Sequence, residues 1–242
     1  MTLYKLQFGY LINRVSSWFL LILALVNIGG VIYATDFVNP GLQDIERMGN
    51  LLQYWNETLT MTKFLLVTAA IFLNILGFFS SFTRYHVYLA NGRGGKKRLV
   101  LAKLAALITL ETLLWANACI SIHLAGFYLT PFFRYEPTFM WALVGLYGQM
   151  IILGLIGALA IQIMDSIFTG IIPLSLFWSL AMKVSIEETD NLGVEVGLST
   201  LIPNPILMNN VYVIESGMAL YLLVFMVLIL FNVVVFIVKD LK

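Results

Sequence analysis

One carboxylate lies deep inside an apolar stretch of this sequence: Glu111, in the run LAALITLETLLWANACISI. Burying a carboxylate in such surroundings costs on the order of several kcal/mol unless the group is protonated, paired or hydrogen-bonded. Asn117 adds a second polar side chain to the same run. Two interpretations follow. Either Glu111 is neutral and hydrogen-bonded to a neighbouring helix, which is a structural role, or Glu111 and Asn117 line a substrate path or carry a proton.

Motifs for phosphate binding, hydrolysis or metal binding are missing from the sequence. It contains no Gly-rich phosphate loop, no His-Glu-x-x-His and no Gly-x-Ser-x-Gly. A single cysteine, Cys119, excludes a thiol metal cluster within the chain, and His86 and His123 fall at opposite ends of one expected hairpin. The pair Glu187-Glu188 lacks the arginine that paired-glutamate membrane proteases place three residues further on. We therefore expect no enzymatic activity, no metal and no cofactor in this chain.

The second group of residues that could act chemically is the basic segment at 84–103, RYHVYLANGRGGKKRLVLAK. It lies between two long apolar runs and contains six basic residues and no acid. Its first residues predict one or two helical turns, which the glycine-rich stretch Asn91–Gly95 would end. This composition fits a docking surface for a soluble partner. It also fits a solvated loop that lies against acidic lipid headgroups.

The elements that must position these residues are transmembrane helices. The chain of 242 residues is 60% hydrophobic and 11% charged, whereas soluble domains carry about 25% charged residues. Six apolar runs near the ~20 residues that a spanning helix needs predict spans at 16–34, 62–82, 99–122, 138–163, 167–183 and 216–238. The fold class is therefore an all-α polytopic membrane protein with one domain over 1–242. Residues 1–14 predict an interfacial helix, or else an extension of the first span.

The basic residues predict the orientation of these spans, because positive charge stays on the cytoplasmic side of a membrane. With both termini and the loop 84–98 in the cytosol, ten of the 14 basic residues are cytoplasmic, namely Lys5, Arg14, Arg84, Arg93, Lys96, Lys97, Arg98, Lys103, Lys239 and Lys242. The expected location is the cell membrane. Loops 35–61, 123–137 and 184–215 would then lie outside. Two prolines break the apolar part of the third loop, which predicts a re-entrant helical segment before the sixth span.

Two shorter features concern packing and turns. The run 138–163 contains Gly154, Gly157 and Ala158, small residues that let helices approach closely. We expect this closeness to serve packing within the bundle. Asp165 and Ser166 form the short cytoplasmic connection to the fifth span, either as a capped turn or as a second contact with a cytosolic partner.

The architecture resembles the ABC-2 family of ABC transporter permeases. The resemblance covers an N-terminal interfacial segment, six spans, a basic loop after the second span and a broken apolar segment before the sixth. Its motif residues are Asn91-Gly92, Lys97-Arg98 and Ala102-Lys103-Leu104. In that family the loop after span two is a coupling helix that docks on an ATPase, which implies that coupling residues here are Arg84, Tyr85, His86, Tyr88, Leu89, Asn91, Gly92 and Arg93.

The resemblance also implies partners and a function. The chain would be the permease subunit of an exporter, paired with a second copy or a homologous permease in the lipid bilayer. ATP and Mg²⁺ would be bound by a separate ATPase subunit, and no nucleic acid is expected as a partner. The compact size resembles permeases of Gram-positive bacteria that export peptides or confer lantibiotic immunity, so an amphipathic peptide or lipid-like substrate is expected. The alternative is a non-transporting membrane receptor, scaffold or immunity protein.

Overall fold

The computed structural model describes residues 3–12, 14–38, 47–79, 95–131, 133–135, 137–164, 166, 168–173, 175–176 and 211–239. Every regular element within these ranges is a helix, so the prediction of an all-α fold is confirmed for the described part of the chain. The helices are α1 (Leu3–Leu11), α2 (Arg14–Val38), α3 (Arg47–Phe79), α5 (Gly95–Leu129), α6 (Pro137–Met164) and α9 (Val211–Val238).

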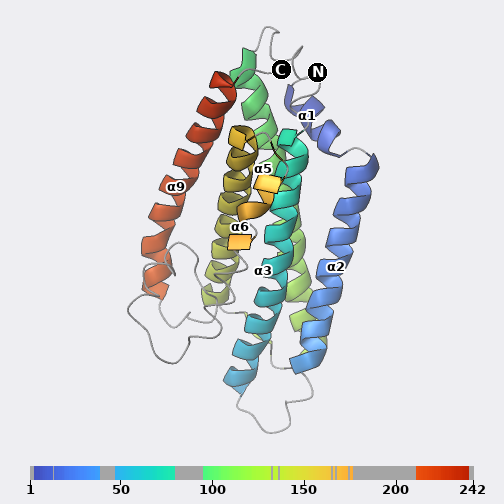
Figure 1. The fold of residues 1–242 in the computed structure, drawn as a ribbon. Coiled ribbons are helices and arrows are strands. Elements are labelled where there is room, and N and C mark those ends of the chain that lie inside the picture. The colour runs from blue at the N-terminus through green and yellow to red at the C-terminus, as the bar shows by residue number, and fades with distance from the viewer. Residues whose placement is uncertain are drawn as a thin grey trace.

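The long helices run side by side along one direction, as Figure 1 shows. Helix α5 contacts each of the other five helices named above, and α3 packs against α1, α2, α5 and α6. The start of α1 and the end of α9 lie at the same end of the bundle (Figure 1). The ends of α3 and α6 and the start of α5 lie there too, so α2, α3, α5 and α6 alternate in direction, whereas α9 runs in the same direction as α6.

Three of the described helices are long and apolar enough to cross a membrane. The stretches are Glu57–Phe78 in α3, Gly95–Leu129 in α5 and Leu143–Met164 in α6. Helices α2 and α9 contain shorter apolar stretches, Ser17–Tyr33 and Leu222–Val238. Large apolar side chains of these two helices are exposed along their length, among them Leu25, Tyr33, Leu222, Met226 and Leu230. Such outward apolar surface fits a lipid environment.

Helices α3 and α5 extend beyond the spans that hydropathy predicts. Helix α3 begins at Arg47 and has 33 residues, because Leu51, Tyr54 and Trp55 continue its buried face at helical spacing. The part of the loop predicted at 35–61 that begins at residue 47 is therefore continuous with the helix of the second span. Helix α5 has 35 residues, about 52 Å at ~1.5 Å per residue. It includes both the last residues of the loop predicted at 84–98 and the first residues of the loop predicted at 123–137.

Several predicted elements lie outside the described residues. They are the coupling segment as far as Gly94, most of the fifth span and the re-entrant segment as far as residue 210. Of the fifth span, residues 168–173 are helical and include the buried Pro173. The six-span count and the re-entrant segment therefore stay predictions.

Candidate functional site

The buried carboxyl group of Glu111 joins two helices. Glu111 is on α5 and only 2% exposed. Its Oε1 accepts a hydrogen bond of 2.7 Å from Nδ2 of Asn74 on α3, and Asn74 is likewise 2% exposed. The same Nδ2 donates to the carbonyl of Ala70, also at 2.7 Å. The amide of Asn74 thus uses both of its N–H groups, one within its own helix and one across to α5.

A glycine on a third helix lies against this pair. A Cβ atom added to Gly154 of α6 would lie 2.6 Å from Asn74 Nδ2 and 2.9 Å from Glu111 Oε1. Such distances are far below van der Waals contact, so only a glycine lets the α6 backbone approach the pair this closely. We call Asn74, Glu111 and Gly154 the polar junction. It lies where α3, α5 and α6 meet, and the close approach at Gly154 fits the packing role expected of small residues in the run 138–163.

Asn117 is not part of the polar junction. It follows Glu111 by six residues on α5, which places it ~9 Å further along the axis and about 120° away around it. Asn117 is half-buried, and its backbone carbonyl accepts a hydrogen bond of 2.7 Å from Ser121. The structure therefore separates the two polar residues that the sequence suggested as one path.

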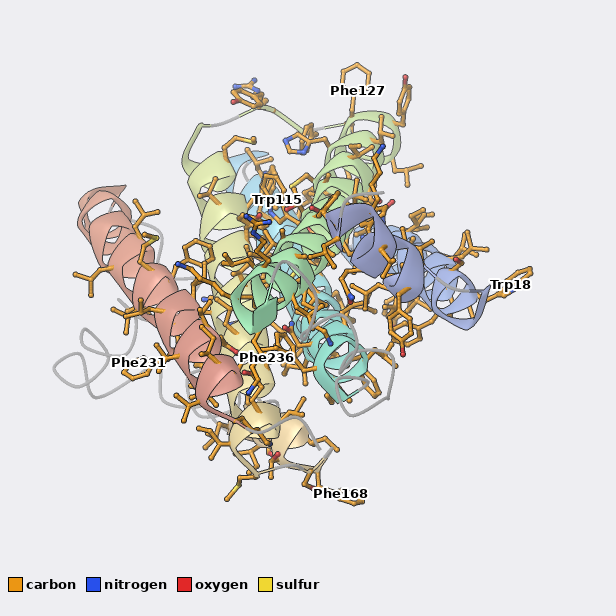
Figure 2. The ribbon with its side chains drawn as sticks, turned by 90° about the horizontal axis from the view of Figure 1, so that it is seen from above. Trp18, Trp115, Phe127, Phe168, Phe231 and Phe236 are labelled. Atoms are coloured by element: carbon orange, nitrogen blue, oxygen red, sulfur yellow. The ribbon has the colours of Figure 1, made fainter. Side chains whose placement is uncertain are left out.

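Other polar contacts of α5 fix α1 and α6 against it. Thr112 Oγ1 lies 2.7 Å from the Tyr147 hydroxyl, and Trp115 Nε1 donates to the carbonyl of Leu143 at 2.8 Å. On the α1 side, the Tyr4 hydroxyl donates to Thr109 Oγ1 at 3.1 Å. In the view of Figure 2, Trp115 lies over the bundle and away from the outer faces of α2 and α9. These contacts give polar side chains of α5 partners on the neighbouring helices.

A second group of contacts occupies the end of the bundle where α5 begins. We call this the basic end and define it by Lys96, Lys97, Arg98, Lys103 and Lys239. Lys103, 1% exposed, donates from Nζ to the carbonyl of Gly77 at 2.7 Å and lies 5.6 Å from the centre of the Phe78 ring. Gly77 is in the last turn of α3, where carbonyls lack partners within the helix and the helix dipole favours a cation.

Two further lysines bind the ends of helices at the basic end in the same way. Lys96 Nζ donates to the carbonyls of Ile237 at 3.2 Å and Lys239 at 2.8 Å, at the end of α9. Lys239 Nζ in turn donates to the carbonyl of Gln162 in the last turn of α6. Lys97 and Arg98 differ from these lysines, because both are exposed. Among the described residues of the basic segment, Lys96 and Lys103 therefore bind helix ends, whereas Lys97 and Arg98 are exposed.

The residues predicted to couple to an ATPase lie outside the described part of the chain. These are Arg84, Tyr85, His86, Tyr88, Leu89, Asn91, Gly92 and Arg93. The structure describes the two points between which they must lie, Phe79 at the end of α3 and Gly95 at the start of α5. Gly95 has a φ of 63°, a backbone conformation that favours glycine. Together with the Lys103–Gly77 contact, this fixes the points at which the segment leaves and re-enters the bundle.

The opposite end of the bundle contains an aromatic cluster formed by the buried Tyr54 and Trp55 and the half-buried His123 and Phe133. The Trp55 ring stacks on Phe133 at 5.9 Å and meets the edge of His123 at 5.5 Å. The Tyr54 hydroxyl donates to the carbonyl of Ile122 at 2.5 Å, and burial raises the pKa of that hydroxyl above its ordinary value. Tyr54 is therefore a neutral donor that ties α3 to α5 at this end, which we call the aromatic end.

Sequence reasoning missed Asn74 and the roles of the lysines. Asn74 is the lone amide in the apolar run 62–82, so the rule that flagged Glu111 could also have flagged Asn74 as its partner. Lys103 lies four residues inside the predicted third span, which is a comparable signal. Nothing in the local sequence distinguishes Lys96 from Lys97. Only the rotation of α5 decides that Lys96 points toward α9 while Lys97 is exposed.

No buried cluster of three or more metal-ligating side chains is found among the described residues. The contacts described above join helices to one another. The polar junction fixes three helices deep in the bundle, and the basic end joins the ends of four helices. In comparisons with known proteins, no protein family model matches the chain and no curated protein is significantly similar to it.

Proposed function

We propose that this chain is the permease subunit of an ABC exporter of the ABC-2 type. A separate ATPase would bind the segment 84–94 in the cytosol, and the energy of ATP hydrolysis would drive export of an amphipathic peptide or lipid-like molecule. Three observations support the proposal. The segment is basic and glycine-broken, the chain has no nucleotide-binding motif, and a long apolar helix precedes and another follows the segment in the chain.

The observation that carries the proposal is how the segment is held. It joins the end of α3 to the start of α5, and the buried Lys103 ties those two helices together immediately beyond it. A solvated anchor loop needs no such buried attachment. A segment that must transmit force does need such an attachment. Without it, a displacement of the segment would be taken up by a flexible connection and would not move the helices.

The docking role predicts the result of adding negative charge to this segment. The double substitution Tyr88→Asp and Leu89→Asp should sharply reduce the amount of ATPase that co-purifies with the chain, while membrane insertion stays normal. Two acids would disturb both the apolar contact and the positive potential of the segment. The measurement is the molar ratio of ATPase to permease after mild detergent extraction from the native membrane.

The matched control carries the same two acids at the aromatic end, as Phe127→Asp and Tyr128→Asp. Both of those aromatic side chains are exposed. Equal recovery of the ATPase with the Tyr88/Leu89 variant and the unmodified chain would contradict the docking role. If no ATPase accompanies the unmodified chain at all, the receptor, scaffold or immunity interpretation replaces the permease.

The orientation of the bundle is part of the proposal. We place the basic end in the cytosol, since the basic residues favour that side ten to four. In a Cys119→Ser background, a cysteine at Asp190 should react with an impermeant thiol reagent added to intact cells. A cysteine at Asn91 should react only after the membrane is opened. Labelling of both positions from outside would refute this topology.

Within this function Glu111 is a structural joint. Its carboxyl group binds Asn74 and is covered by Gly154, so the contact holds three helices in register. The other role, in which Glu111 lines a path for substrate or protons, is separated from this one by Glu111→Gln. That variant should assemble and export normally if the residue is a joint, and should assemble but lose export if it serves the path.

A further inference from the structure

At the basic end, three lysines donate hydrogen bonds to the end of a helix. In each case it is a different helix from the one that the lysine belongs to or directly follows. Lys103 of α5 caps α3, Lys96 of α5 caps α9, and Lys239, next to the end of α9, caps α6. In every case the acceptor is a carbonyl in the last turn of a helix or just beyond it, a position without an intrahelical partner. Four helices are thus joined in sequence, in the order α3, α5, α9 and α6.

We propose that Lys96, Lys103 and Lys239 form a clamp through which a displacement of the adjoining ends of α3 and α5, which the segment 84–94 connects in the chain, moves α9 and α6 with them. The segment is continuous with α3 and α5 only. Through the clamp, the displacement also moves α9, which begins more than 100 residues after the segment in the chain. The role of the clamp in transport rests on the proposed function, whereas its role in holding α9 against α5 does not.

Side-chain contacts below the lysines reinforce the same connections. The Phe78 ring, which lies under Lys103, meets the edge of Phe236 of α9 at 6.4 Å. In Figure 2 Phe236 lies on the side of α9 that faces the bundle, and Phe231 lies on the other side. Between α6 and α9, Gln162 Nε2 donates to Asn232 Oδ1 at 2.7 Å, and Asn232 Nδ2 donates to the carbonyl of Leu155 at 3.2 Å.

Lys96 is the member of the clamp that can be tested without unfolding the protein. Lys103 is 1% exposed, so its loss endangers the core, whereas Lys96 is only partly buried. Lys97 supplies a matched control, because it is adjacent, carries the same charge and is exposed. Lys96→Met and Lys97→Met remove one positive charge each from the same helical turn. Lys96→Arg keeps a long cationic donor and should retain the clamp.

The first measurement is the distance between spin labels on α2 and α9 in the full chain in lipid nanodiscs. The labels are placed at Trp18→Cys and Val238→Cys in a Cys119→Ser background, since both positions are exposed. Trp18 lies at the opposite side of the bundle from α9 (Figure 2). Lys96→Met should broaden the distance distribution and shift it to longer distances. Lys97→Met and Lys96→Arg should leave it unchanged. An unchanged distribution in Lys96→Met would overturn the clamp.

The second measurement uses the complex with the co-purified ATPase, before and after addition of ATP and vanadate. The label distance should change with nucleotide in the Lys97→Met complex and lose this response in Lys96→Met, while both complexes still hydrolyse ATP. An equal response in the two variants would overturn transmission through Lys96. Absence of any ATPase would contradict the proposed function, but the first measurement could still be made on the chain alone. Failure of the proposed function and failure of the clamp are therefore distinguishable.

Discussion

Replacing Asn74 with leucine should destabilise the protein more than any other single change at the polar junction. The substitution leaves the Glu111 carboxyl without the hydrogen bond that it accepts at 2.7 Å while it stays 2% exposed. Glu111→Leu leaves only one N–H of Asn74 unsatisfied, because its other N–H still binds Ala70. Asn74→Leu removes two hydrogen bonds of 2.7 Å, to Glu111 and to Ala70, whereas Glu111→Leu removes one, and a buried polar group left without a partner costs about 1–3 kcal/mol. Thermal unfolding in detergent micelles would rank the two variants.

The double variant Asn74→Leu with Glu111→Leu provides the decisive comparison. Removing both partners of a buried hydrogen bond together is close to neutral, because no unsatisfied group is left. The double variant should therefore be more stable than Asn74→Leu alone. Glu111→Gln keeps an acceptor oxygen at nearly the same place and should change the free energy of unfolding by less than about 1 kcal/mol. Additive losses in the double variant would show that the two side chains act independently.

The glycine of the polar junction tests the same contact from the third helix. Gly154→Ala puts a Cβ atom 2.6 Å from Asn74 Nδ2, so the amide must move and the bond to Glu111 must weaken. Gly157→Ala is the control on the same helix, since its nearest non-helix atom would lie 3.5 Å away, at ordinary contact distance. The alanine at 154 should lower the unfolding temperature, and the alanine at 157 should leave it nearly unchanged.

Removal of the buried tryptophan at the aromatic end should have the second large effect. Trp55 is 1% exposed and contacts the rings of Tyr54, His123 and Phe133. Trp55→Ala leaves a cavity between α3, α5 and residue 133, and such substitutions typically cost about 3–5 kcal/mol. The drop should be visible as a lower unfolding temperature and as faster proteolysis.

A neighbouring aromatic side chain provides the control for this prediction. Tyr128 of α5 is 74% exposed, so Tyr128→Ala removes a ring of similar size without opening a cavity in the bundle. Its effect on the unfolding temperature should be small. If Trp55→Ala and Tyr128→Ala lowered the unfolding temperature equally, the aromatic cluster would not stabilise this end of the fold.

Glu111 and its partners show which features could be predicted from the sequence. A carboxylate in an apolar run must find a partner, because an apolar environment offers none. The sequence therefore left two roles open for Glu111: a place on a path for substrate or protons, or a hydrogen bond from a neighbouring helix. Which neighbour provides it depends on the rotation and height of α3 and α6 relative to α5. Those are set by packing across three helices, so Asn74 and Gly154 became partners only in the folded chain.

The positions at which the helices begin and end were likewise only partly predicted from the sequence. Hydropathy located apolar stretches in α3, α5 and α6, because exclusion from water acts on each stretch separately. It placed the start of α3 at residue 62 and the end of α5 at residue 122, whereas the helices begin at Arg47 and end at Leu129. The added turns are held by the aromatic cluster, which involves residues from α3, from α5 and from beyond α5.

By itself, the sequence determined the all-helical class, the apolar helices and the asymmetry of basic charge, since these depend on local composition. The tertiary structure alone decided that Lys96, Lys103 and Lys239 bind the ends of other helices while Lys97 and Arg98 face outward. The physical reason is that a lysine finds an unsatisfied carbonyl only where another helix ends beside it, and the position of that end is a property of the whole bundle.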